Sequence, residues 1–170
     1  MFFIRVFFCV LLTFFVLSKI ATAQVIEDVY YNWTVFEYDN ELSSDGKKCY
    51  VTSFPVKKIG NHGNLKRKPY ILITRFAKNK KEEVSVYSGY DYKPSSNVHM
   101  LIDQEQFKLF THNDLAWSKT AEIDKKVISK MLNASIIKVR GDSANSTYSV
   151  DEYSLKGFGR AYKRMKDICK

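Results

Sequence analysis

The sequence predicts a mainly β domain, either a sandwich or a barrel, with two short helices. Many short segments alternate apolar and polar residues, which is typical of strands that bury one face. Eleven Tyr and two Trp are distributed among these segments, and aromatic side chains favour strands. Only two segments show the 3.6-residue period of a helix. Many short strands with few helices are typical of a sandwich or barrel.

Residues 1–23 are predicted to be a secretory signal peptide. Arg5 precedes an apolar run from Val6 to Leu17, and the segment ends in Ala21-Thr22-Ala23. Small residues at these last positions are what signal peptidase accepts. A transmembrane anchor is the alternative, but the run is shorter than the roughly 20 apolar residues that span a bilayer. We therefore expect an exported protein with no transmembrane segment after cleavage.

The cysteines of the remaining domain, residues 24–170, are predicted to form a disulfide. Cys49 and Cys169 are the two that remain after cleavage, and an oxidising compartment favours their pairing. A bridge closing a loop of about 120 residues is worth roughly 4–5 kcal/mol in the chain-entropy model. A catalytic thiol is the competing interpretation, but a nucleophilic cysteine needs no partner at the other end of a domain.

Strands separated by turns are expected in the first two thirds of the domain. The alternation places them around residues 31–35, 49–53, 70–74, 84–86, 98–102 and 107–109. Asp45-Gly46 supplies the positive-φ turn chemistry that precedes the second strand. Residues 56–68 are polar and basic and contain Gly60 and Gly63, so we expect a loop there.

Two helices are predicted in the last third. The first is capped by Ser118 or Thr120, and its apolar residues follow one helical face; they are Ile123, Val127, Ile128 and Met131. Strands are expected at 136–139 and 148–155. The last helix begins near Gly157, and its apolar stripe consists of Phe158, Ala161, Tyr162 and Met165.

No enzyme motif is visible in the sequence. It lacks a G-x-S-x-G elbow, an H-E-x-x-H pair and a phosphate-binding loop. His62, His99 and His112 show no metal-ligand spacing. The adjacent acids in Glu82-Glu83 and Asp151-Glu152 point to opposite faces of a strand, so we interpret them as solvated charges. We therefore expect neither an enzyme nor a cofactor or metal site.

Runs of basic residues are the clearest candidates for binding. The formal net charge is +9. Predicted loops contain Lys57, Lys58, Lys66, Arg67 and Lys68, as well as Lys78–Lys81, and the last helix adds Arg160, Lys163, Arg164 and Lys166. Such a surface favours anionic partners, such as lipid headgroups or acidic glycans. The alternative is a solvated surface that keeps the protein soluble. Nucleic acid is not expected, because no RNA-binding aromatic motif is present.

The tripeptide Arg140-Gly141-Asp142 matches the motif that animal integrins recognise. Three residues match by chance often, so the motif is a weak indication. Recognition requires an exposed, tightly turned loop, and a loop is predicted here because the tripeptide follows the apolar strand at 136–139.

Over about residues 31–169, the chain resembles the invasion-associated locus B family of Gram-negative bacteria. The resemblance rests on an ordered set of short features: Trp33-x-Val35, Cys49-Tyr50, Gly89-Tyr90, Ala116-Trp117, Asp151-x-x-Ser154-Leu155-x-Gly157-Phe158, Ala161 and Cys169. The family often has an Arg-Gly pair before the position of Thr147, where this chain has Asn145-Ser146. We expect that departure to loosen a turn without changing the fold.

The resemblance implies an immunoglobulin-like β-sandwich, export to the periplasm or the outer-membrane surface, and a link to host-cell invasion. It implies no catalytic residues. The expected function is that of a non-enzymatic binding or envelope protein that acts by surface recognition of a host or envelope component. The alternatives are a periplasmic structural protein that supports envelope integrity, and a hydrolase whose site assembles only in the fold.

Overall fold

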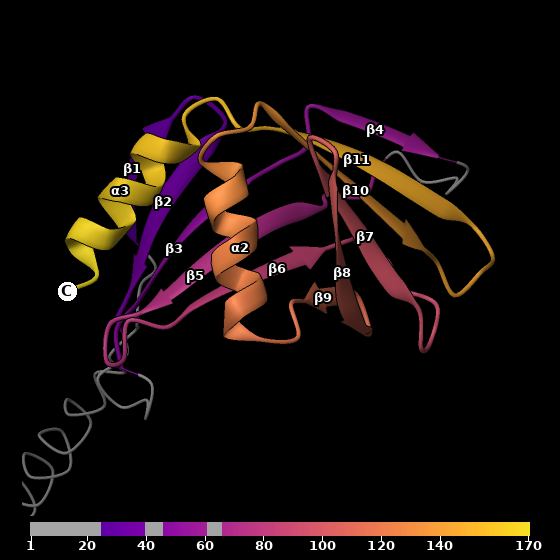
Figure 1. Ribbon diagram of the computed structural model, residues 1–170, viewed down its shortest axis with the longest axis horizontal. Helices are drawn as coiled ribbons and strands as arrows, with labels where there is room; N and C mark the ends of the chain where they lie inside the picture. Colours follow the sequence, from indigo (N-terminus) through magenta and orange to yellow (C-terminus); the bar gives the residue numbers. More distant parts are fainter. Residues whose placement is uncertain (1–24, 40–45, 61–65) are drawn as a thin grey trace, which may run out of the picture.

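The computed structural model describes residues 25–39, 46–60 and 66–170 (Figure 1). The predicted signal peptide, Asp45 and His62 lie outside these residues. The strands are β1 (Val25–Tyr30), β2 (Trp33–Tyr38), β3 (Lys48–Ser53), β4 (Lys57–Gly60), β5 (Tyr70–Phe76), β6 (Glu82–Tyr87), β7 (Asn97–Ile102), β8 (Glu105–His112), β9 (Leu115–Trp117), β10 (Ile136–Asp142) and β11 (Tyr148–Ser154). The helices are α2 (Ala121–Met131) and α3 (Phe158–Ile168).

All the described strands belong to one antiparallel sheet, in the order β1-β2-β3-β5-β6-β9-β8-β7-β10-β11-β4. β3 and β4 lie third and last in this order, yet only residues 54–56 join them. Four Cα–Cα steps span at most about 14 Å, so the sheet must curl until its β4 edge returns towards β3. In Figure 1, β1, β2 and β3 lie on one side of the molecule, and β10, β11 and β4 lie on the other. The short link from the end of β3 to the start of β4 connects the two sides.

The curl brings the two halves of the sheet together across a shared core. The indole nitrogen of Trp33, in β2, donates to the carbonyl oxygen of Ser154, at the end of β11, at 2.9 Å. The mainly β fold with two short helices is confirmed. The arrangement is consistent with the predicted sandwich, although the strands are hydrogen-bonded into one sheet; the immunoglobulin-like detail stays a prediction.

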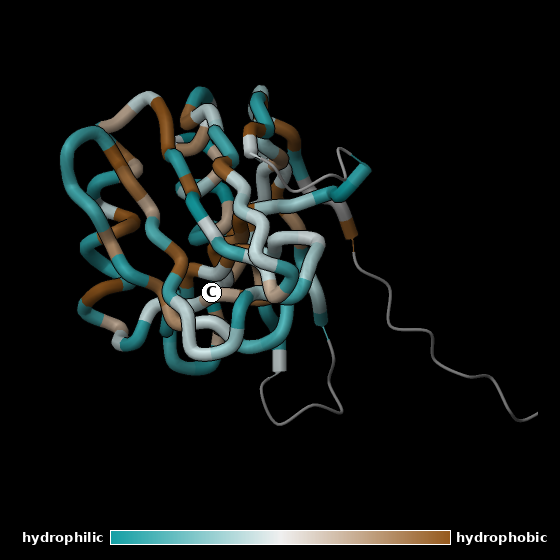
Figure 2. Tube along the Cα trace, turned by 90° about the vertical axis from the view of Figure 1, so that its right-hand side faces the viewer, coloured by the Kyte–Doolittle hydropathy of each residue, from teal (hydrophilic) through white to brown (hydrophobic). Residues whose placement is uncertain are grey.

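Strands such as β3 and β10 alternate between buried and less buried residues, and Figure 2 shows repeated changes of hydropathy along the trace. Both predicted helices are confirmed, and each buries its predicted apolar stripe, except that Ile123 in α2 is only partly buried. In α3 the ring of Phe158 lies 4.7 Å from that of Trp33. In α2 the side chain of Thr120 caps the first turn by accepting a hydrogen bond from the backbone N–H of Ile123. The two helices therefore complete the core.

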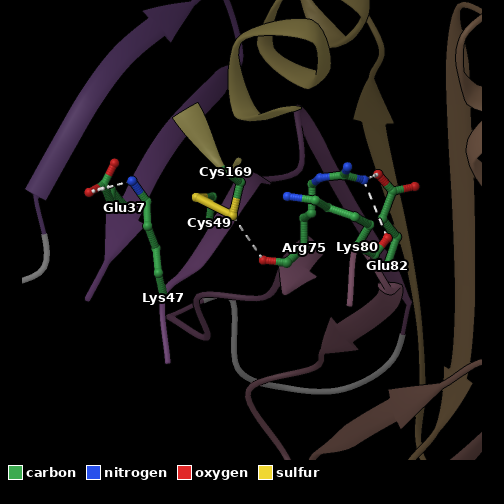
Figure 3. Close-up of a disulfide and its surroundings, with 7 residues drawn as sticks. All are labelled: Glu37, Lys47, Cys49, Arg75, Lys80, Glu82 and Cys169. Atoms are coloured by element: carbon green, nitrogen blue, oxygen red, sulfur yellow. Dashed lines mark hydrogen bonds and ion pairs between the residues drawn. A yellow bond between two sulfur atoms is a disulfide. The ribbon is translucent and has the colours of Figure 1, made fainter. Parts of the chain in front are cut away.

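The predicted disulfide between Cys49 and Cys169 is confirmed (Figure 3). The two Cα atoms are 5.7 Å apart and 120 positions separate the residues in sequence. Both cysteines are fully buried. Because Cys169 directly follows α3, the bond fastens the end of this helix to β3. Both thiols of the described domain are used in this bond, which excludes the alternative of a catalytic thiol.

The loop predicted at residues 56–68 is partly wrong, because it contains strand β4. This strand pairs with β11, with Lys57 opposite Glu152 and Lys58 opposite Asp151. It is an edge strand with a single neighbour, and its residues are mostly exposed. Such a strand needs no alternating apolar residues, so the hydrophobic pattern of the sequence did not reveal it.

Candidate functional site

Arg67 lies inside the molecule and not on its surface. Its guanidinium nitrogens lie 2.5 and 2.7 Å from the two carboxylate oxygens of Asp151 in β11, and it also donates to the carbonyl oxygen of Ser88 at 3.2 Å. Both charged residues are buried. The expectation that Asp151 is solvated is therefore wrong, and the structure does not present Arg67 to an anionic partner.

Asp151 keeps the buried Arg67 charged. Burial alone lowers the pKa of the guanidinium, but the hydrogen bonds and the charge of Asp151 outweigh that effect and raise it. The ring of Tyr90 lies beneath the guanidinium, 5.7 Å from it. The Tyr90 hydroxyl donates to the carbonyl oxygen of Gly141 at 3.0 Å and lies 2.7 Å from Oγ of Ser149. This polar cluster joins the segment before β5 to β10 and β11, which is a structural role.

The four lysines of the predicted basic set are divided between two segments. Lys57 and Lys58 belong to β4, whereas Lys66 and Lys68 flank Arg67 just before β5. Lys57, Lys66 and Lys68 are exposed. Lys58 is half-buried, and its ammonium donates to the carbonyl oxygen of Arg67 at 3.1 Å. The three exposed lysines, which we call the β4-side lysines, are the part of this set that a partner can reach.

The tripeptide Arg140-Gly141-Asp142 ends strand β10 and does not form a turned loop, so that expectation is wrong. Gly141 is buried, and a Cβ atom there would lie 2.4 Å from the ring of Tyr92. The guanidinium of Arg140 stacks over the ring of Tyr148, 4.6 Å from its centre. Packing against Tyr92 therefore explains the glycine, without a role in recognition.

Helix α3 separates apolar and basic residues onto opposite sides. Its apolar stripe packs against β2 and β3, and Arg160, Lys163 and Lys166 are exposed. Residues 156–170 contain six basic residues and one acid, Asp167. A formal charge of +5 in 15 residues is more than half of the net +9 of the whole chain. Residues 67–81 carry a formal charge of +6 in the same length, so the segment around α3 is one of several strongly basic segments of the chain.

Two tyrosines at the turn between β1 and β2 lie against the start of α3. Tyr31 is 60% exposed, and its ring lies 4.3 Å from the ammonium of Lys156 and 5.1 Å from the guanidinium of Arg160. Tyr30 also contacts Arg160, at 5.7 Å. A Cβ at Gly157 would lie 2.1 Å from the carbonyl oxygen of Tyr30, so glycine permits this close approach. Cations over aromatic faces are held there by the ring quadrupole.

A shallow hollow of about 250 Å³ lies between the β1–β2 turn and α3. Its lining consists of Tyr30, Arg160, Lys163, Arg164 and Asp167. Arg164 is paired with Asp28 at 2.7 Å. Within the described ranges, no acidic group lies at ion-pair distance from Arg160 or Lys163.

We call Lys156, Arg160, Lys163 and Arg164, together with Tyr30 and Tyr31, the basic face of α3. Its arginine and lysine side chains were part of the sequence-based prediction, except Lys156. The two tyrosines were missed. The available indication was the adjacent pair of aromatic residues before Asn32, because successive residues of an extended segment point to opposite faces, so that one of the two points away from the core.

In the part of the chain that the structure describes, no three His, Cys, Asp or Glu side chains are grouped so that they could hold a metal ion. His99 lies beside Gln106 on the β7–β8 hairpin, and His112 is exposed at the end of β8. Among the described helices, none has the length and apolar character needed to cross a membrane.

Fold and site together define a disulfide-closed, mainly β protein with a concentrated basic surface. The family model described as "Invasion associated locus B (IalB) protein" matches residues 33–166, and the chain belongs to this family. The membership confirms the resemblance found in the sequence, associates the chain with invasion in general, and is consistent with the predicted export. No curated protein and no solved structure matches the chain.

Proposed function

We propose that this chain is an exported, non-enzymatic binding protein that contributes to host-cell invasion by recognising an anionic partner with the basic face of α3. The partner is a component of the host or of the bacterial envelope. Family membership supports the link to invasion. The observation that carries the binding proposal is the exposed ring of Tyr31, which lies against both Lys156 and Arg160.

The chemistry of this face suits carboxylate, sulfate or phosphate groups. Arg160 offers a planar fork of donors that matches such oxyanions, and Lys163 adds a second charge beside it. The tyrosine contacts hold the cations in place before binding, which reduces the conformational entropy lost on association. Because the face is open and shallow, repeated anionic groups on a polymer or a membrane surface fit it better than a single enclosed anion.

The direct test is binding of the mature protein to two polyanionic probes, heparin and phosphatidylglycerol vesicles, with phosphatidylcholine vesicles as the neutral control. We expect heparin or the anionic vesicles to bind and the neutral vesicles not to bind. Affinity should fall steeply between about 50 and 500 mM salt, because exposed charges are screened over a Debye length of about 10 Å at 0.1 M. Absence of binding to both anionic probes at low salt contradicts the proposal.

Location decides whether the contribution to invasion is direct. Protease added to intact bacteria, with a known periplasmic protein as control, should degrade this protein if it is displayed on the surface. Protection that disappears when the outer membrane is opened would place it in the periplasm. In that case the partner is an envelope component, and the contribution to invasion is indirect. Retention in the cytoplasm would contradict export altogether.

A further inference from the structure

A second and larger hollow lies apart from the basic face of α3, where the chain leaves β9 and enters α2. Its volume is about 540 Å³. The lining residues come from the starts of β6 and α2 and from the ends of β8 and β9, which Figure 1 shows close together at the lower end of α2. We call this hollow the α2 cleft. No residue of the basic face of α3 lines it.

One wall of the α2 cleft is an aromatic pair. Phe110 and Trp117 are directly opposite each other in the β8–β9 ladder, and their rings stack with centroids 5.6 Å apart. Phe110 is 39% exposed, because the neighbouring Leu109 occupies the inner face of β8. Phe110 is therefore not fully buried in the core. Exposed apolar surface in a cleft is typical of a binding site.

The remaining lining of the α2 cleft is polar. Lys81 and Glu83 form an ion pair at 2.6 Å, and Lys119 is exposed. Asp124 is buried in the first turns of α2, and one of its carboxylate oxygens accepts a hydrogen bond from the backbone N–H of Val84 at 2.9 Å. Thr111 and Thr120 belong to the same lining; the hydroxyl of Thr111 donates to the carbonyl oxygen of Ser96, and that of Thr120 accepts from the backbone N–H of Ile123. Positively and negatively charged side chains thus line the same cleft as the aromatic pair.

We propose that the α2 cleft binds one ring of a carbohydrate. A pyranose has one relatively apolar C–H face, which the negative faces of Trp117 and Phe110 attract. Its hydroxyl groups both donate and accept hydrogen bonds, and the mixed lining of carboxylates, ammonium groups and hydroxyls supplies partners for both. A volume of about 540 Å³ lies within the roughly 300–1,000 Å³ of small-ligand pockets. A purely apolar ligand fits less well, because it would cover Lys119 and Glu83 without replacing their water.

The two tryptophans make the test specific. Trp33 is fully buried and hydrogen-bonded to Ser154, whereas Trp117 lines the α2 cleft. A carbohydrate in the cleft should therefore change the fluorescence and the indole NMR signal of Trp117 and leave those of Trp33 unchanged. The probes are the methyl glycosides of glucose, galactose and mannose, together with N-acetylglucosamine and glucuronic acid. We expect at least one of them to act saturably.

Variants then assign the site. Phe110→Ser removes half of the aromatic wall at an exposed position, and it should weaken binding at least tenfold without changing the thermal midpoint greatly. If this variant does not fold, the assigned indole signals of the wild-type protein provide the same test.

The outcome is independent of the anionic-partner proposal. Replacing Lys156, Arg160 and Lys163 by Gln should leave the response of Trp117 unchanged, since none of them lines the α2 cleft. The proposal is overturned if no sugar of the panel perturbs Trp117, or if Phe110→Ser binds as tightly as the wild type.

Discussion

Arg67 and Arg160 both belong to basic stretches of the sequence, but the fold places them in opposite environments. Arg67 is buried against Asp151, with its guanidinium bonded to both carboxylate oxygens. Arg160 is exposed on α3, where its guanidinium rests on two tyrosine rings. The first arginine holds parts of the sheet together, and the second is available to a partner. A run of Lys and Arg in the sequence therefore does not show which of its members reach the surface.

The partners of the two arginines explain this difference. A buried charge is tolerated only if it is paired and fully hydrogen-bonded, and Asp151, Ser88 and Tyr90 surround Arg67. A charge on an exposed helix keeps its water and needs no such pairing. Removing one partner of a charged residue should thus lower the free energy of unfolding strongly in the interior, and change it very little on the exposed side of α3.

The largest expected effect is that of Asp151→Ala. It leaves the Arg67 charge buried without its partner and should lower the free energy of unfolding by about 3–5 kcal/mol. The matched acid on the exposed side is Asp167, whose replacement by Ala should change stability by no more than about 0.5 kcal/mol. Urea unfolding of the two variants measures the contrast, and equal effects would mean that the Arg67–Asp151 pair is not a structural element.

A further variant separates loss of pairing from loss of packing. Replacing both partners together, with Arg67→Met and Asp151→Leu, removes the charges and keeps side chains of similar volume. Such double replacements of buried pairs are often neutral or stabilising, so we expect this protein to be more stable than Asp151→Ala. If it is equally unstable, the packing around these residues dominates over the charge.

Loss of the disulfide is expected to have the next largest effect. Replacing both Cys49 and Cys169 by Ser should lower stability by about 2–5 kcal/mol, which urea unfolding also measures. Because the bond fastens the end of α3 to β3, the variant tests whether packing alone keeps the helix in place. Heparin binding near the wild-type level, measured well below the unfolding transition, would show that it does.

The third effect concerns alkaline pH. Burial raises the pKa values of Tyr92, Tyr153 and Tyr162 above the ordinary tyrosine value of about 10. Above about pH 10 these groups ionise in the unfolded chain but stay protonated in the folded one, so the folded state binds more protons. The free energy of unfolding should then fall as pH rises, by about 1.4 kcal/mol per pH unit for each such tyrosine.

Urea unfolding between about pH 8 and pH 11.5 checks this slope. Tyr153→Phe is the sharpest comparison, because the Tyr153 hydroxyl is buried and has no hydrogen-bond partner among the described residues. Near neutral pH, this variant should have about the same free energy of unfolding as the wild type. Above about pH 10, its free energy of unfolding should fall less steeply with pH. If the free energy of unfolding falls equally steeply with pH in the variant and in the wild type, Tyr153 does not contribute to the pH dependence.

The smallest effect on stability is expected on the exposed side. Replacing Lys156, Arg160 and Lys163 by Gln removes three charges that have no buried contacts to lose, and surface substitutions usually change stability by about 0.5 kcal/mol or less. Thermal unfolding measures this. A large destabilisation would show that the cation–π contacts with Tyr30 and Tyr31 are needed for folding, as the Arg67 pair is.

Sequence patterns predicted the parts of this fold that follow a hydrophobic period. The stripe of α3 and most strands were located because their buried residues repeat regularly, and the cysteine pairing followed from export. Strand β4 was missed, because an edge strand carries no such period. The burial of Arg67 was missed for another reason: its partner Asp151 lies 84 positions away, and nothing local indicates that contact.

The candidate site was predicted in a similar way. The basic residues of α3 could be read directly from the sequence, since they lie opposite its apolar stripe. Their contacts with Tyr30 and Tyr31 could not, because they depend on how the β1–β2 turn meets Gly157. The aromatic wall of the α2 cleft likewise depends on the register that places Phe110 opposite Trp117.

We expect the position of the charges, and not their number, to determine binding. Two triple variants with the same change of net charge distinguish these two possibilities. One replaces Lys156, Arg160 and Lys163 of the basic face of α3 by Gln, and the other replaces the β4-side lysines Lys57, Lys66 and Lys68 by Gln. Heparin affinity at fixed salt should fall at least tenfold in the first variant and less than threefold in the second. Equal losses in both variants, or a greater loss in the second, would contradict the assignment of the site to α3.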